Sequence, residues 1–252
     1  MRPSILQFDP TPEAVIEPHT ESLGGNLPDL GVLCFFPDVL ETLAKRGTLQ
    51  QIGTIYSEMG HNPVYKLVHN GQSFTVAHPG VGGPLAAFFT EILIANGCRA
   101  FIACGGAGVL HPDLQMGHII VPNTAVRDEG TSYHYLPPEQ TAKASETAVH
   151  AIKTTLKKHH IPYAIGKTWT TDAYFRETRQ KVQQRQAQGC LTVEMETATF
   201  FAVAQFRGIT FGQLLYGGDD LTGDNWNDRD WIKQPSTREK LFWLAVEACS
   251  LL

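Results

Sequence analysis

The sequence of residues 84–108, PLAAFFTEILIANGCRAFIACGGAG, predicts a helix followed by a strand. Pro84 is a favoured first residue of a helix, and apolar residues then recur at helical spacing at positions 85, 88, 89, 92 and 93. Gly97 stands where the C-terminal cap of this helix is expected. Residues 100–104 are apolar and typical of a short buried strand, and the small residues 105–108 predict a tight turn after it.

The same alternation of strands and helices continues on both sides of this stretch. Patterns typical of strands lie at residues 30–36, 51–57, 63–68, 74–77, 119–121, 164–170, 191–193 and 209–216, and helices are expected at 141–159, 176–188, 196–207 and 237–252. Such alternation predicts an α/β fold with a single-domain, mixed, mainly parallel β-sheet flanked by helices. Residues 1–29, rich in Pro, Glu and Gly, are interpreted as an irregular N-terminal lead-in, and residues 30–252 as the domain.

Composition excludes several classes of function. Hydrophobic residues make up 42% of the 252 residues, charged residues 18%, and the formal net charge is −5. Without a basic run or a long apolar run, we expect no nucleic-acid partner, no membrane partner and a cytoplasmic location. The five scattered cysteines fit buried, reduced thiols, and no metal-ligand spacing is present, so we expect neither a metal nor a cofactor.

Four segments that follow predicted strands carry the candidate chemistry. Ligands of parallel sheets bind beyond the carboxyl ends of the strands, so these segments should meet. Glycines allow a close backbone approach to a ligand, and a carboxylate at a strand end suits acid–base work. Taken singly, each segment also fits a turn, close packing, a helix N-terminal acid or a helix cap. They read HPGVGGP at 78–84, ACGGAG at 103–108, VEMETA at 193–198 and GGDDL at 217–221.

In this order and spacing the four segments resemble the nucleoside phosphorylase superfamily. That group includes purine nucleoside phosphorylases, uridine phosphorylases and related nucleosidases. The resemblance runs from about residue 30 to residue 221, and GHIIVP at 117–122 with VRDEGTS at 126–132 is most similar to uridine phosphorylases. It implies a nucleoside phosphorylase-like catalytic domain that cleaves the N-glycosidic bond of a nucleoside.

The resemblance also implies roles for particular residues. Glu196 corresponds to the catalytic glutamate that binds the ribose hydroxyls, Met195 to the methionine that packs on the sugar, and Glu194 to the acid before it, and all three are expected to contact the ribose. Asp219 corresponds to the catalytic aspartate that protonates or hydrogen-bonds purine N7. The base is expected to stack on Tyr174 and to lie beside Gly106 and Ala107.

The phosphate site departs from the family pattern. Arginines that grip phosphate are replaced by the sequence CFFPDV at 34–39 and by Ala103, and none is found near residues 58–60. Without guanidinium groups the bidentate grip on phosphate is lost. Candidates for an anion or nucleophile site are then Gly82, Gly105, Gly106, Arg127 and Asp38.

Three functions remain open at this point. The first is phosphorolysis to free base and pentose 1-phosphate, with inorganic phosphate as co-substrate. Purine is slightly favoured over uridine, because Asp219 is present and the uracil-reading pair is not clear at 178–180. The second is a phosphate-independent nucleosidase, with Asp38 or Glu41 activating water, and the third a non-catalytic nucleoside or base binder. A cationic pocket beside Ala103 and Val39 would support phosphorolysis, and an apolar one lined by Phe35 and Phe36 would count against it.

Assembly is implied by the resemblance as well. Members of the family form dimers that assemble into hexamers, so we expect a homodimer or homohexamer in which a neighbour's residue closes the sugar site. His19 and His61 are the candidates for that residue. Residues 225–231, NWNDRDW, are interpreted as either a flap over the site or an oligomer contact.

Overall fold

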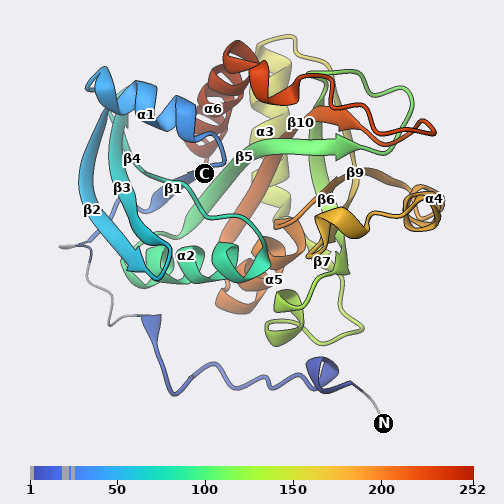
Figure 1. Cartoon of the computed structure of the whole chain (residues 1–252). Coiled ribbons are helices and arrows are strands. Elements are labelled where there is room, and N and C mark those ends of the chain that lie inside the picture. The colour runs from blue at the N-terminus through green and yellow to red at the C-terminus, as the bar shows by residue number, and fades with distance from the viewer. Residues whose placement is uncertain (1–2, 19–22, 24–25) are drawn as a thin grey trace.

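A mixed β-sheet with helices on both faces forms the body of the protein (Figure 1). The computed structural model describes residues 3–18, 23 and 26–252. Within them the ten strands are β1 (Leu30–Cys34), β2 (Leu49–Ser57), β3 (Gly60–His69), β4 (Gln72–Ala77), β5 (Ala100–Val109), β6 (Ile119–Asp128), β7 (Ala142–Lys143), β8 (Tyr163–Thr171), β9 (Cys190–Glu194) and β10 (Thr210–Asp220). The α-helices of the same residues are α1 (Pro37–Lys45), α2 (Gly83–Ala95), α3 (Glu146–Lys158), α4 (Arg179–Ala187), α5 (Thr197–Arg207) and α6 (Pro235–Cys249).

Strand directions confirm the mainly parallel sheet that the sequence predicts. β4, β1, β5 and β10 are neighbours and run parallel, as do β6, β8 and β9. Antiparallel pairs join the two groups where β10 meets β6 and β5 meets β9, and β2 and β3 extend the sheet as an antiparallel meander. The carboxyl ends of β1, β5 and β10 therefore lie side by side at one edge of the sheet.

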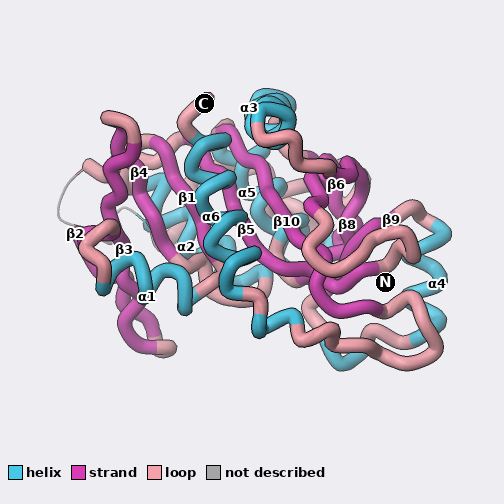
Figure 2. Tube along the Cα trace, turned by 90° about the horizontal axis from the view of Figure 1, so that it is seen from above, coloured by secondary structure: helices cyan, strands magenta, loops and turns pink. Residues whose placement is uncertain are grey.

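Helices cover the sheet in two layers (Figure 2). α6 packs on β1 and β5 with α1 and α3 beside it, and α2 and α5 pack together on the other face. Apolar side chains fill both interfaces. Between α5 and the sheet the ring of Phe211 stacks on Phe200, with centroids 4.8 Å apart, and on Phe101 at 5.8 Å. This burial holds the strand ends that carry the site in fixed positions.

The glycine-rich end of β5 differs from the sequence prediction. Residues 105–108 were expected to form a tight turn, but they continue the strand to Val109 and pair with β10 and β9. A Cβ atom at Gly108 would lie 2.7 Å from Leu221 Cδ1 and 2.9 Å from Val193 Cγ1. The glycines are therefore required for the close approach of three strands, and the turn prediction was wrong.

Two other expected elements change their bounds. The helix expected at 141–159 begins only at Glu146, because residues 142–143 pair with β6 as β7. The helix expected at 176–188 begins at Arg179, after a 3₁₀ turn over Tyr174–Arg176. This turn places residues 174–177 beside the carboxyl end of β8.

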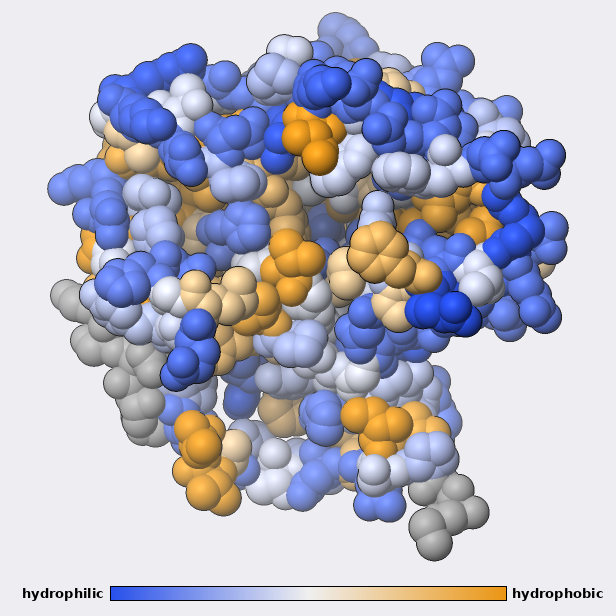
Figure 3. Space-filling view, in the orientation of Figure 1, coloured by the Kyte–Doolittle hydropathy of each residue, from blue (hydrophilic) through white to orange (hydrophobic). Residues whose placement is uncertain are grey.

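The N-terminal lead-in runs along the outside of the body (Figure 1). Its described part is irregular apart from a 3₁₀ turn at Ser4–Leu6, and the carbonyl of Pro12 accepts a hydrogen bond from Arg207 of α5 at 3.2 Å. Val15 and Ile16 are exposed there, and Figure 3 shows apolar side chains along this lower edge. In the described ranges, every helix is too short or too polar to span a membrane. The five cysteines are buried and unpaired.

Candidate active site

A cavity of about 210 Å³ lies at the carboxyl ends of the parallel strands. Its walls come from the ends of β1, β5, β9 and β10, from the 3₁₀ turn after β8 and from the first turn of α6. Eight of the residues singled out in the sequence line it, namely Gly105, Gly106, Ala107, Tyr174, Glu194, Met195, Glu196 and Asp219. Residues at or just after the ends of four different strands therefore lie together in one cavity, as the sequence predicts.

Glu196 is a buried acid between β9 and α5. Its side chain is 6% exposed, and Oε1 accepts a hydrogen bond from the backbone N–H of Gly82 at 2.6 Å while Oε2 accepts one from Met195 at 3.3 Å. Burial and the neighbouring Glu194 raise the pKa of Glu196 to about 8. Gly82 therefore serves to hold Glu196, and this N–H is not free for a phosphate.

Glu194, two residues earlier, is fixed by the protein itself. One oxygen accepts from the hydroxyls of Thr170 and Thr168 at 2.7 and 3.3 Å, and the other from the backbone N–H groups of Glu196 and Thr197 at 2.7 and 2.6 Å. These N–H groups open α5, where a carboxylate satisfies unpaired donors. Although Glu194 lines the cavity, these bonds give it a structural role in place of the ribose contact that the resemblance implied.

Asp219 lies near the end of β10 and lines the same cavity as the β9–α5 junction. Its Oδ2 accepts a hydrogen bond from Trp226 Nε1 at 2.7 Å, and burial raises the pKa of its carboxyl. The next residue, Asp220, points elsewhere: it pairs with Arg229 and accepts from the backbone N–H of Thr222 at 2.8 Å. Of the two adjacent acids, only Asp219 lines the cavity among the described residues.

The segment 222–231 folds back over the end of β10. Asp220 and Asn227 exchange backbone hydrogen bonds at 2.8 and 3.1 Å, and the Tyr216 hydroxyl donates to the Trp231 carbonyl at 2.9 Å. Trp231 lines the cavity, and Trp226 holds Asp219. Of the two interpretations of this segment, the structure supports a cover over the site.

Glu177 is a site residue that the sequence analysis missed. It follows the 3₁₀ turn that carries Tyr174, lines the same cavity, and has its pKa raised to about 8 by burial and by the charge of Asp219. No donor of the described residues bonds its carboxyl group. The rule that ligands bind beyond strand ends pointed to the segment after β8, but Glu177 lies six residues beyond its end at Thr171 and no local pattern marks it.

Comparison with known proteins identifies the family. A sequence model described as the Phosphorylase superfamily matches residues 29–241. The chain belongs to the phosphorylase superfamily.

Relatives in the phosphorylase superfamily differ in the activity that they are named for. The chain is 29% identical to a guanosine phosphorylase of Halorubrum lacusprofundi over 175 residues, which are 68% of this chain and 73% of that one. It is 30% identical to a uridine phosphorylase of Treponema pallidum over 212 residues, 77% of this chain and 80% of that one.

Solved structures share the fold of this superfamily member. A purine nucleoside phosphorylase from Toxoplasma gondii, in complex with immucillin-H, has a TM-score of 0.77 at 20% identity, covering 92% of this chain and 93% of that one. An AMP nucleosidase from Bacteroides thetaiotaomicron has a TM-score of 0.72 at 23% identity, covering 89% and 88%. The fold of this chain is thus shared by proteins named as a phosphorylase and as a nucleosidase.

The wall of the cavity beside the end of β1 and the start of α6 combines apolar side chains with one guanidinium group. Phe35 and Phe36 line it, and so does Arg238, from the first turn of α6. The Arg238 guanidinium lies 4.8 Å from the Phe36 ring centre, and its Nη2 pairs with Asp38 Oδ1 at 3.0 Å. Arg238 is 8% exposed, and its Nε is buried without a hydrogen-bond partner. No local pattern in the sequence of α6 indicated this role.

Besides Gly82, two expected members of the anion site lie outside the cavity. Arg127 Nε donates to Ser132 Oγ at 2.8 Å, its Nη atoms donate to three backbone carbonyls of residues 136–140, and it stacks 4.1 Å from the Tyr133 ring centre. The structure therefore corrects the expectation that Arg127 offers a free guanidinium to an anion: it fixes a loop instead. Asp38 is half-exposed and reaches the site only through its ion pair with Arg238.

Other candidates from the sequence lie away from the cavity. Glu41 pairs with Lys45 at 3.7 Å on the surface of α1. His61 on β3 packs against Tyr56 with ring centroids 4.7 Å apart, and His19 lies outside the described residues. In the part of the chain that the structure describes, no cluster of three or more His, Cys, Asp or Glu residues could hold a metal.

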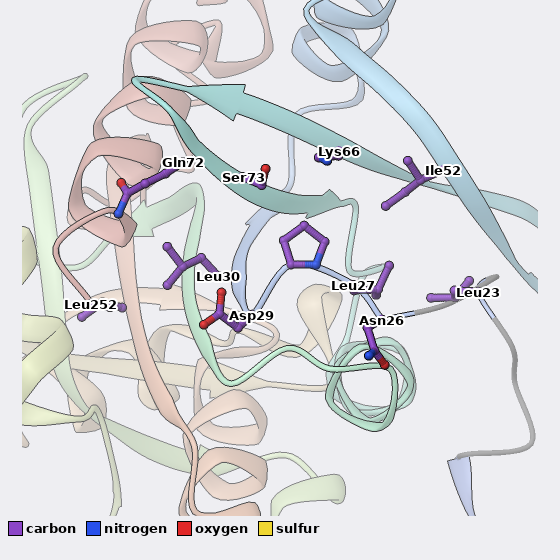
Figure 4. A pocket seen from close by; sticks show the side chains of 11 residues that line it. Leu23, Asn26, Leu27, Asp29, Leu30, Ile52, Lys66, Gln72, Ser73 and Leu252 are labelled. Carbon is purple, nitrogen blue, oxygen red and sulfur yellow. The ribbon is translucent and has the colours of Figure 1, made fainter.

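A larger depression of about 710 Å³ lies at the opposite end of β1 (Figure 4). Its titratable side chains are Asp29 and Lys66, and its remaining walls are apolar or neutral. Because it lies at the amino ends of the parallel strands, it lacks the converging acids of the smaller cavity. The smaller cavity is therefore the candidate active site despite its size.

Proposed function

We propose that this chain cleaves the N-glycosidic bond of purine nucleosides by phosphorolysis, which yields free base and pentose 1-phosphate. The observation that carries the proposal is that Glu196 and Asp219 line one cavity from different strand ends. A carboxylate at one end can accept hydrogen bonds from a ribose diol, and an acid at the other can hydrogen-bond the purine. A site for binding alone would not need buried acids at its base end.

The base end supports a purine. Asp219 and the exposed Tyr174 ring line the same shallow pocket, where an acid can hydrogen-bond a purine and the ring can stack on it. Breaking the bond leaves negative charge on the base, so an acid that hydrogen-bonds the base stabilises the transition state. Similarity to a guanosine phosphorylase supports the same choice.

Phosphate as the nucleophile is supported by Arg238. Arg238 Nη1 donates to the Ile232 carbonyl at 3.3 Å and Nη2 pairs with Asp38, so Nε is the nitrogen without a partner, and burial of the guanidinium strengthens its attraction for a negative charge. In this proposal inorganic phosphate is the co-substrate, and Arg238 takes the place of the arginines missing after β1 and in β5.

Hydrolysis is the second candidate. The apolar walls from Phe35 and Phe36, and the neutralisation of Arg238 by Asp38, favour water over phosphate at this place. A single guanidinium also grips phosphate less firmly than the several found in the family. The two candidates share the cavity and differ only in the nucleophile.

Base release from a panel of purine and pyrimidine nucleosides, with and without inorganic phosphate, tests both candidates. Purine release that requires phosphate and yields ribose 1-phosphate is the expected result, and Arg238→Met should raise the KM for phosphate at least tenfold. Release of free ribose without phosphate would establish hydrolysis instead. Tight nucleoside binding without release would make the chain a binder and overturn the proposal.

We also propose that the enzyme works as a homodimer or larger homo-oligomer. Val81 lines the cavity while more than half exposed, and Phe88 of the adjoining α2 is exposed as well. A second copy covering these side chains would also close the cavity. Light scattering after size exclusion should give at least twice the monomer mass of 27.8 kDa.

A further inference from the structure

Two carboxyl groups, Glu177 and Asp219, face the same base end of the cavity. Both line this cavity and also a shallower one beside it, whose walls include Tyr174, Phe175, Leu221 and Trp226. They come from segments far apart in the sequence, the turn after β8 and the end of β10. Two acids that share a poorly solvated space do not both ionise readily, so the pair holds a proton near neutral pH.

The surroundings of the two acids differ. Burial raises the pKa of Asp219, but a hydrogen bond from Trp226 Nε1 and the charge of Arg229 both act in favour of its ionised form. Glu177 receives no hydrogen bond from the described residues, and burial raises its pKa. Asp219 is the more buried of the two, but only Asp219 has a hydrogen bond that stabilises its carboxylate, so the proton donor is assigned to Glu177, whose ionised form is less stabilised.

We propose that Glu177 is the proton donor to the leaving base, and that the ionised Asp219 is the partner that keeps Glu177 protonated. This inference rests on the proposed cleavage of a purine nucleoside, but it holds for either nucleophile. It moves the acid role from Asp219, to which the resemblance assigned it, to a residue outside the four segments.

In the proposed step, each bond that breaks is matched by one that forms. The C1′–N9 bond breaks and its electron pair passes to the purine, while the Glu177 proton moves to N7 and leaves a carboxylate. An oxygen of the nucleophile forms the new bond to C1′. The proton that this nucleophile releases, from hydrogen phosphate or from water, returns to Glu177 and restores the acid.

Other charged groups around Glu177 set the pH at which it titrates. Lys181, on the next helix, lowers its pKa, whereas Asp219 raises it. Arg179 and Asp224 line a small pocket beside it, and Arg179 donates to the Leu221 carbonyl at 2.9 Å. Burial and Asp219 outweigh Lys181, so the pKa of Glu177 is about 8; its acid form is present at neutral pH and is lost at higher pH.

Substrates that differ in their need for a proton test the assignment. Guanosine and inosine need protonation of the leaving base, whereas 7-methylguanosine already carries the positive charge at N7 and does not. Glu177→Gln should lower kcat on guanosine and inosine by about 100-fold or more and leave 7-methylguanosine within a few-fold of wild type. The retained activity on 7-methylguanosine also shows that the variant is folded.

The pH dependence supplies a second readout, at saturating phosphate. For the wild type, kcat on guanosine should fall as pH rises above about 8, since the acid form of Glu177 is lost. Asp219→Asn removes the neighbouring charge, so this fall should move to lower pH. Glu146→Gln, a matched change on the exposed start of α3, should leave rate and profile unchanged.

The opposite pattern would overturn the inference. If Asp219→Asn abolished guanosine turnover, spared 7-methylguanosine, and Glu177→Gln kept most guanosine activity, Asp219 would be the donor. If the wild type releases purine and Glu177→Gln has the same kcat on guanosine as the wild type, this inference is overturned and the proposed function stands. A wild type that releases no base from any of the three nucleosides overturns the proposed function together with it.

Discussion

At the scale of single residues, Glu194 and Glu196 show how two identical side chains take different roles. The two glutamates precede and follow Met195 in the sequence. Glu194 accepts four hydrogen bonds from threonine hydroxyls and from the start of α5, whereas Glu196 accepts two backbone N–H groups and keeps acceptor capacity toward the cavity. One carboxylate holds the helix, and the other is available to a ligand.

Exchanging each glutamate for glutamine should separate the two roles. Glu196→Gln should lower kcat/KM for a nucleoside about 100-fold, about 2.7 kcal/mol, with little change in Tm. Glu194→Gln places an amide NH₂ or a weaker acceptor against two N–H groups and should cost about 1–3 kcal/mol of unfolding free energy. Thermal melting and steady-state kinetics on both variants check this, and equal losses of stability would contradict the separation.

The sequence indicated most of the acids but not their division of labour. VEMETA at 193–198 and GGDDL at 217–221 marked Glu196 and Asp219 because each follows a strand. Glu177 follows a strand too, but a 3₁₀ turn intervenes, so no local pattern distinguished it from a surface glutamate. Glu177 and Asp219 line one cavity because the turn after β8 lies close to the end of β10 in three dimensions.

At the scale of elements, the end of β5 depends on glycines that allow two other strands to approach. The small residues at 105–108 were expected to form a turn, because glycine clusters are typical of turns. Their reason is steric, since side chains of Leu221 and Val193 occupy the space where a Cβ of Gly108 would lie. A steric need of this kind depends on tertiary neighbours and leaves no separate mark in the sequence.

Gly108→Ala should therefore damage both the fold and the site. The added Cβ would lie 2.7 Å from Leu221 Cδ1 and 3.4 Å from Asp219 Oδ1, so these side chains or the segments that carry them must shift. We expect a loss of about 1–3 kcal/mol in unfolding free energy and at least a tenfold loss in kcat/KM. Gly130→Ala is the control, because its nearest atoms are 3.7 and 3.8 Å away. Similar Tm values for the two variants would refute the steric argument.

At the scale of the whole molecule, the cavity is assembled from both halves of the chain. Phe36 and Arg238 are about 200 residues apart, yet the guanidinium lies 4.8 Å from the Phe36 ring centre because α6 packs back across β1. The alternation of strands and helices was enough to predict the sheet and the edge that carries the site. It could not predict which residue of a helix at the far end of the chain would supply a positive charge there.

Acids buried at the carboxyl edge of the sheet also make the stability of the whole molecule depend on pH. Glu177 and Glu196 have pKa values of about 8, raised from 4.5 by burial and by neighbouring carboxylates, so the folded state binds protons that the unfolded state has already lost. Their stabilising contribution is complete below about pH 4.5 and is lost as pH rises through about 8. Burial lowers the pKa of His78, which has the opposite effect near and below pH 6.5, so the clearest window is pH 7 to 9.

The free protein should therefore lose Tm between pH 7 and pH 9. Across that window the free energy of unfolding should fall on the order of 1–3 kcal/mol. Glu177→Gln removes one of the two titrating groups, so its Tm should fall less over the same range, while Glu146→Gln should follow the wild type. Calorimetry of the three proteins at pH 7, 8 and 9 provides the measurement. Three parallel curves would mean that Glu177 is ionised in the folded protein at neutral pH, and that its carboxyl group is better solvated than the structure indicates.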